Sequence, residues 1–289
     1  MGRASLFLSG LLSLTACSSD TLFGADRTAD EWLVEMASVY EKGAISCDFS
    51  MEINAPEFGD EGVKLEGNMI ALDQDHSRVK VKIGMVPPGM ESTMQMEILT
   101  VTDGEMIWME MDLPPEAGGP QVMKLSLIEA REFAEQSSTS ALGNLGAGGG
   151  MVGAGNMDPF AQIQQLTRFI DFEIKEVNSA QVVLEGEMTD DFLSQLGPAL
   201  EGSEAEVSRM TLILDRKRGS PAAIFLGGEE SPFMTIRFSN YRFLEEAPAP
   251  ESFAYEPEEG IFVTDLGPLL QMMAPAGLGA ESSEDEDEF

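Results

Sequence analysis

The sequence predicts an α+β protein in which one antiparallel β-sheet holds most of the residues and a few helices cover it. Two observations predict this fold class. Short segments that alternate apolar and polar residues follow one another over residues 45–111, and a second series spans residues 172–255. A few other segments, before and between the two series, carry apolar residues at helical spacing. Runs of strands separated from helices are typical of the α+β class.

The first element is expected to be a helix. Asp30 can cap it, and Lys42-Gly43 can end it. One face of this helix is apolar, with Trp32, Leu33, Met36, Ala37 and Tyr40 at helical spacing.

The first series of strands is expected to form a continuous antiparallel meander. Its turns contain the residues that favour turns: Asp73-Gln74-Asp75, Pro87-Pro88-Gly89 and Asp103-Gly104. The expected strands are residues 45–53, 63–72, 78–85, 93–102 and 105–111.

The second half is expected to hold further helices and the remaining strands. Helices are expected at residues 125–136, at 190–200, and from Asp158-Pro159, where proline takes the favoured first position. The Gly-, Ser- and Ala-rich segment 137–156 is interpreted as a loop inside the domain, or alternatively as a functional lid. Strands are expected at residues 172–177, 180–187, 207–215, 221–226, 233–245 and 253–255.

The amino terminus predicts export. Arg3 is followed by an apolar run and then by Leu14-Thr15-Ala16-Cys17, which resembles the lipobox of bacterial lipoproteins. The resemblance implies that Cys17 becomes the acylated first residue of the mature protein, and that Ser18 directs sorting to the outer membrane, where the chain faces the periplasm. Alternatively, the segment is a plain secretory signal that contains a cysteine.

These features divide the chain into four expected parts. Residues 1–16 form the signal peptide and residues 17–28 a lipidated tether. Residues 29–270 form one domain. Residues 271–289 form an acidic, disordered tail, because their last nine residues contain six acids.

The charge argues against some classes of partner. The formal net charge is −34, and the sequence lacks the stripes of Lys and Arg that bind nucleic acid. Binding to nucleic acid is therefore not expected. The acidic surface is interpreted as solvated; steering of a cationic partner is the alternative. Cys47 has no partner once Cys17 is acylated, and its place in an alternating apolar run predicts core packing rather than a reactive thiol.

No catalytic or metal-binding constellation is recognisable. The single histidine, His76, lies in a turn and is expected to be solvated, and no Gly-x-Ser-x-Gly elbow is present. Cysteine or histidine pairs at metal-ligand spacing are missing, as is a phosphate-binding glycine motif, so no metal and no cofactor is expected.

Three motifs, taken in order, resemble the LolA/LolB-like family of lipoprotein carriers. The first is Val101-Thr102-Asp103-Gly104-Glu105-Met106-Ile107-Trp108. The second joins Met210-Thr-Leu-Ile-Leu-Asp215 through Pro221 to Ile236-Arg237-Phe238-Ser239-Asn240-Tyr241. The third is Phe253-Ala-Tyr255-Glu-Pro257-Glu258-Glu-Gly260-Ile-Phe-Val263-Thr-Asp265, in which Glu258 replaces the second proline of the family pattern.

The resemblance implies a curved antiparallel sheet, an incomplete barrel, whose concave apolar face is covered by helices and accepts acyl chains. It therefore suggests a non-catalytic carrier or receptor for a lipid or for the acyl chains of a lipoprotein, anchored to the membrane by its lipid. The partner protein is not predicted.

Methionine-rich strands are compatible with this function, because methionine adapts its shape to chains of different length. The candidate groove residues are Met94, Met96, Trp108, Ile236 and Phe238. Alternatively, these residues fill a closed core, and the protein is a structural or partner-binding envelope lipoprotein. A third alternative, an exported hydrolase, would have to use His76 or a carboxylate pair.

Overall fold

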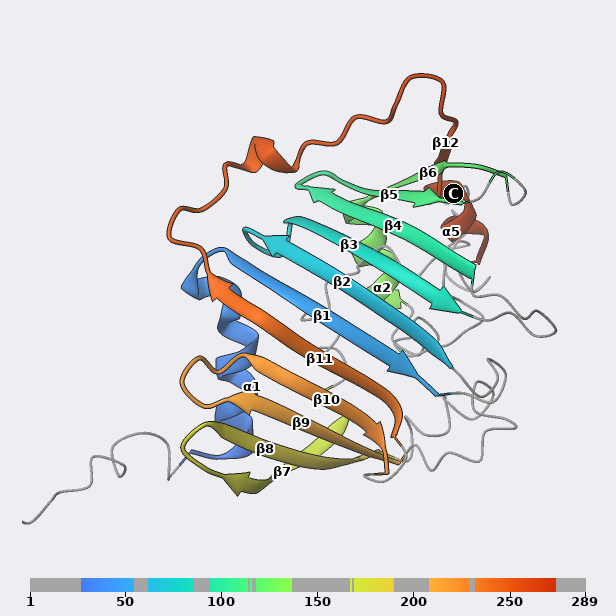
Figure 1. The fold of residues 1–289 in the computed structure, drawn as a ribbon. Coiled ribbons are helices and arrows are strands. Elements are labelled where there is room, and N and C mark those ends of the chain that lie inside the picture. Colours follow the sequence, from blue (N-terminus) through green and yellow to red (C-terminus); the bar gives the residue numbers. More distant parts are fainter. Residues whose placement is uncertain are drawn as a thin grey trace, which may run out of the picture.

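The computed structural model describes residues 27–54, 62–85, 94–113, 115, 118–136, 167, 169–189, 208–228 and 232–273. Within these ranges the strands form one sheet of twelve (Figure 1). The strands are β1 (Ile45–Ile53), β2 (Val63–Ala71), β3 (His76–Met85), β4 (Met94–Asp103), β5 (Met106–Asp112), β6 (Gln121–Ser126), β7 (Ile170–Val177), β8 (Gln181–Met188), β9 (Arg209–Asp215), β10 (Pro221–Gly227), β11 (Pro232–Phe243) and β12 (Val263–Asp265). The helices are α1 (Ala29–Ala37), α2 (Leu127–Gln136) and α5 (Gly267–Met273), with the short 3-10 helices η2 (Ser38–Lys42) and η6 (Pro250–Phe253).

The sheet consists of two meanders that meet at β1. Its order is β12-β6-β5-β4-β3-β2-β1-β11-β10-β9-β8-β7, so β1 pairs with β2 on one side and with β11 on the other. Among the described strands only β12 and β6 pair in parallel. The predicted meander of β1 to β5 is confirmed, and the strand bounds agree with the predicted ones to within two residues.

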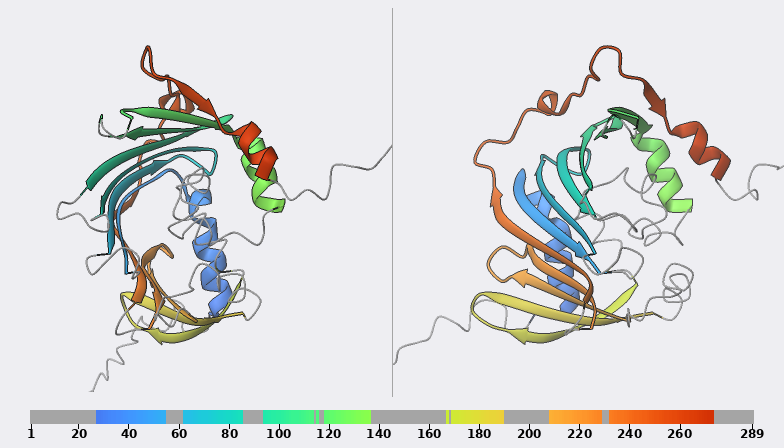
Figure 2. Two further views of the ribbon diagram at one scale, coloured as in Figure 1. Left: turned by 90° about the vertical axis from the view of Figure 1, so that its right-hand side faces the viewer. Right: turned by 45° about the vertical axis from the view of Figure 1, so that its right-hand side comes forward.

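The sheet is curved but not closed. Figure 2 shows that the edges formed by β7 and β12 stay apart, and that α1 and α2 lie on the concave side. The predicted fold class is therefore confirmed: an antiparallel sheet, shaped as an incomplete barrel, with helices on its concave face. We call this concave side the inner face.

Helix α1 begins two residues earlier than the sequence suggested. Thr28, and not Asp30, is the N-cap: its hydroxyl accepts a hydrogen bond from Glu31 N, and the Glu31 carboxylate accepts one from Thr28 N. This reciprocal pair satisfies two of the free N–H groups at the helix start. The helix buries Ala29, Trp32 and Met36 against the sheet.

Other predictions near the end of the first series and in the second half are wrong or lie outside the described residues. Residues 121–126 form β6, so Leu125 and Ser126 belong to a strand and not to the predicted helix. Residues 253–255 form no strand; Phe253 ends η6. The expected loop 137–156, most of the helix from Asp158, the helix 190–200, the segment 1–26 and residues 274–289 lie outside the described ranges.

The segment 244–262 connects β11 with the distant edge strand β12. It passes around the end of the sheet where the β2–β3 and β4–β5 turns lie (Figure 1). We call this segment the strap. Phe253 within it is 2% exposed, and its ring lies 6.1 Å from that of His76.

Candidate functional site

One row of aligned side chains crosses the inner face of the sheet. Strand pairing places its members in direct register across eight neighbouring strands, which follow one another in the sheet in the order β4, β3, β2, β1, β11, β10, β9 and β8. We call this the inner row, and it consists of Met96, Ile83, Leu65, Met51, Ile236, Ile224, Leu212 and Leu184.

The inner row is covered unevenly. From Ile236 to Leu184 its side chains are at most 4% exposed and belong to the core cluster that contains Trp32 and Met36 of α1. The other four, Met51, Leu65, Ile83 and Met96, are only partly buried. We call these four the half-buried segment of the row. Apolar side chains that remain partly open next to a packed core are typical of ligand-binding surfaces.

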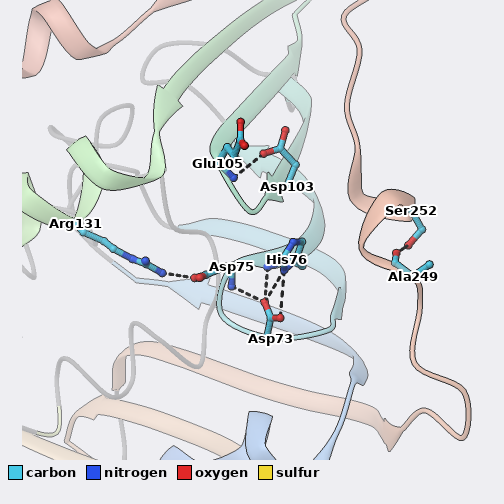
Figure 3. Close-up of polar contacts among 8 residues, drawn as sticks. All are labelled: Asp73, Asp75, His76, Asp103, Glu105, Arg131, Ala249 and Ser252. Atoms are coloured by element: carbon cyan, nitrogen blue, oxygen red, sulfur yellow. Dashed lines mark hydrogen bonds and ion pairs between the residues drawn. The ribbon is translucent and has the colours of Figure 1, made fainter.

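The two helices stand on either side of this half-buried segment. Helix α1 packs on the cluster of β7 to β11, and α2 contributes Ala130 to the cluster of β4 to β6. Arg131 of α2 forms an ion pair with Asp75 in the β2–β3 turn, so the helix contacts the sheet at this point (Figure 3).

Three of the five candidate groove residues lie on the inner face. Met96 belongs to the half-buried segment, Ile236 is 4% exposed below α1, and Phe238 is partly buried between the two clusters. The backbone of Met94 begins β4, but its side chain lies outside the described residues, as do Cys17 and Ser18.

Trp108, the fifth candidate, lies on the opposite face. Its neighbours in β5, Ile107 and Met109, point inward, so Trp108 points outward. Its Nε1–H donates to Asp103 Oδ2 at 2.9 Å, and its ring lies 5.4 Å from that of Tyr255 in the strap. The structure therefore separates Trp108 from Met96, Ile236 and Phe238.

Tyr255 holds the strap on this outer face. Its hydroxyl donates to Glu110 Oε2 at 2.8 Å. Burial raises the pKa of the Tyr255 hydroxyl, and the hydrogen bond to Glu110 and the negative charge of that carboxylate raise it further. Tyr241 also has a raised pKa, caused mainly by burial.

His76 is not the solvated turn residue that the sequence suggested. It is the first residue of β3, its side chain is 21% exposed, and its Nδ1 lies 3.0 Å from Asp73 Oδ1 (Figure 3). The same Asp73 oxygen accepts hydrogen bonds from the backbone N–H groups of Asp75 and His76. Asp73 therefore acts as a turn-forming side chain.

The described residues contain no group of three His, Cys, Asp or Glu that could hold a metal ion. Cys47 is 1% exposed on the inner face, as its alternating pattern predicted. No helix among the described residues is long and apolar enough to cross a membrane.

Sequence reasoning did not identify Met51, Leu65 and Ile83 as site residues. Their alternation with polar neighbours did indicate a common face within each strand. Their alignment with Met96 depends on the register between strands, which the sequence of one strand does not contain.

Comparison with known proteins gives structural neighbours of low sequence identity. No protein-family model matches the chain, and no curated protein matches it. The chain is similar to MucB in its complex with MucA(peri), with 15% identity and a TM-score of 0.37 over 79% of this chain; it spans 60% of the MucB chain. It is similar to LprF from Mycobacterium bovis, with 12% identity and a TM-score of 0.40 over 76% of this chain and 95% of LprF.

A third neighbour is described as a LolA superfamily protein, from Nitrosomonas europaea. The identity is 12% and the TM-score 0.28, over 79% of this chain and 98% of the neighbour.

Proposed function

We propose that the protein binds acyl chains of a lipid or of a lipoprotein on the inner face of its sheet, without making or breaking bonds. The half-buried segment of the inner row carries this proposal. Burying apolar surface contributes roughly 25 cal/mol per Å², so an acyl chain laid along four partly open apolar residues would be held by the hydrophobic effect alone. Methionines at both ends of the segment adapt to chains of different shape.

The proposal includes an anchor and a location. Cys17 carries the lipid, Ser18 directs the protein to the outer membrane, and residues 17–28 tether the domain 29–270 to that membrane on its periplasmic side. The lipobox-like Leu14-Thr15-Ala16-Cys17 supports this assignment.

Replacing Cys17 by serine is expected to prevent acylation and to release the protein from membranes, because serine lacks the thiol to which the acyl chains attach. The measurement is the mass of the amino-terminal peptide together with membrane fractionation of cells that express the wild type or C17S. Cys47→Ser is the matched control and should leave the anchor in place. Equal membrane association of C17S and the wild type would contradict the assignment.

The binding function is tested on the chain Ser18–Phe289, purified without detergent. Organic extraction followed by mass analysis should recover a lipid in about equimolar amount. Met96→Gln, which places a polar group of similar length in the half-buried segment, is expected to reduce the recovered lipid at least tenfold, about 1.4 kcal/mol.

Ile70→Gln is the matched control, because Ile70 lies on the outer face of β2 and is 39% exposed. It should retain the wild-type amount of lipid. A folded wild type that carries no lipid and does not bind added oleic acid would instead support the alternative, a structural or partner-binding lipoprotein with a filled core.

A further inference from the structure

The side chain of Trp32 carries a buried polar atom without a hydrogen-bond partner. Trp32 lies on the buried face of α1 and is 2% exposed. Its indole Nε1 is buried and has no hydrogen-bond partner among the residues that the structure describes. Buried donors in folded proteins are nearly always paired, because an unpaired one keeps the full cost of losing its water. This N–H therefore calls for a partner that the described residues do not supply.

The chemistry of the indole limits what that partner can be. Nε1–H is a donor only, so the partner must offer an acceptor. The surroundings are apolar: Trp32 belongs to the cluster of β7 to β11, which also includes the partly buried Met51 and Phe238. A partner that fits this cluster is mostly hydrocarbon and brings a single acceptor group.

A positive charge lies on the ring of the same tryptophan. The guanidinium carbon of Arg27 is 4.8 Å from the centre of the Trp32 ring, a cation–π contact. The Arg27 side chain is 45% exposed, and Glu35 is the carboxylate near it, at 4.0 Å. An anionic or strongly polarised oxygen at Trp32 Nε1 would therefore also be attracted by Arg27.

Trp108, the other tryptophan, differs from Trp32 because its indole N–H has a hydrogen-bond partner within the protein. Its Nε1–H is bound to Asp103 at the β4–β5 turn. The two indoles thus differ in whether the described part of the chain provides an acceptor.

We infer that Trp32 Nε1–H is the recognition point for the head of the acyl ligand, donating a hydrogen bond to its carbonyl or carboxylate oxygen while Arg27 attracts the same oxygen. This inference rests on the proposed function and adds the chemical class of the ligand: an acyl group recognised at its carbonyl end. The hydrocarbon tail lies on the inner face, and Trp32 of α1 binds the carbonyl end of the ligand.

The test is a nuclear magnetic resonance titration of the chain Ser18–Phe289 labelled with ¹⁵N at tryptophan, stripped of lipid beforehand. The labelled protein gives two indole signals, and the spectrum of the Trp108→Phe variant shows which one belongs to Trp108. Oleic acid and monooleoylglycerol should each move the Trp32 signal to higher proton frequency as the hydrogen bond forms, whereas hexadecane, which has no acceptor, should not. The Trp108 signal should stay in place with all three probes.

Affinity measurements on variants separate recognition from packing. Substitution of Trp32 by 3-benzothienylalanine, which keeps the ring shape and replaces N–H by sulfur, should weaken oleic acid binding at least tenfold and leave hexadecane binding unchanged. Arg27→Gln should weaken oleic acid binding more than monooleoylglycerol binding. Thr100→Val is the control, because Thr100 Oγ1 is a second buried atom without a partner, on β4.

Each outcome decides a different point. If oleic acid binds while the Trp32 signal does not move, or if only Thr100→Val weakens binding, the inference is wrong and the proposed function stands. If none of the three probes binds, the proposed function fails and the inference fails with it. Equal weakening for oleic acid and hexadecane in the benzothienylalanine variant would show a packing role and would also overturn the inference.

Discussion

Replacing Phe253 by alanine is expected to lower the free energy of unfolding by about 3–5 kcal/mol, the range for removing a buried aromatic side chain. Phe253 is among the largest fully buried side chains that the structure describes, yet it lies in the strap, whose backbone joins the sheet at its start, where Leu244 N donates to Ala44 O, and again at β12. Its ring packs beside His76 at the end of β3. Phe253 thus anchors the middle of the strap by packing, next to the hydrogen bond that Tyr255 makes with Glu110.

The measurement is urea unfolding of the chain Ser18–Phe289, followed by far-ultraviolet circular dichroism. Tyr255→Phe is the control in the same segment; it removes the hydrogen bond to Glu110 and keeps the ring on Trp108, so it should cost about 0.5–1.5 kcal/mol. A loss below 1 kcal/mol in Phe253→Ala would mean that the strap packs only loosely on the sheet.

The second large effect is expected at the centre of the other half of the sheet. Leu212→Ala should lower the free energy of unfolding by about 2–5 kcal/mol, because it removes a fully buried side chain below α1 and leaves a cavity. Leu212 is in register with Leu184 on one side and Ile224 on the other, so both neighbours lose contacts.

Thr211→Ala tests the same strand on its other face, where Thr211 is only partly buried. Its effect should stay within about 0.5 kcal/mol, as for most substitutions near a surface. Equal losses from both variants would contradict the assignment of the inner face. The same unfolding experiment serves for this pair, and the denaturant slope should remain unchanged for both.

The strands were predictable because each one carries its own signal. Alternation in β1, for example, places Ile45, Cys47 and Phe49 on one face, and the structure buries all three. The turn at Asp103-Gly104 was also recognisable, since Gly104 has a φ of 98°, in the left-handed region that favours glycine.

Two elements were misread because their local patterns conflict with their surroundings. In residues 121–126 the apolar residues run directly into those of α2, so the strand and the helix share one apolar stretch. In the strap, Phe253 and Tyr255 alternate as in a strand, but Phe253 is buried and Tyr255 rests on Trp108. Side-chain packing, not backbone pairing, holds this segment.

The candidate site was only partly predictable, since it depends on which face of each strand turns inward. Both faces of β5 are apolar around Trp108, so its sequence does not reveal that Trp108 lies outside. The alignment of the half-buried segment follows from the order of strands, and that order joins β1 to β11, a pairing between distant parts of the chain.

This pairing also determines when the protein can finish folding. Asp48 of β1 accepts a hydrogen bond of 2.6 Å from Asn240 of β11, a residue 192 positions later. Contacts over such separations form slowly, because a long loop has to close first. The chain emerges amino terminus first, whether from a ribosome or across a membrane, so β1 is available long before β11 and has an open edge until β11 pairs with it. Such an edge can pair with other chains. Because β1 lies in the middle of the sheet, the late strand β11 has to pair with it before its edge is closed to other chains.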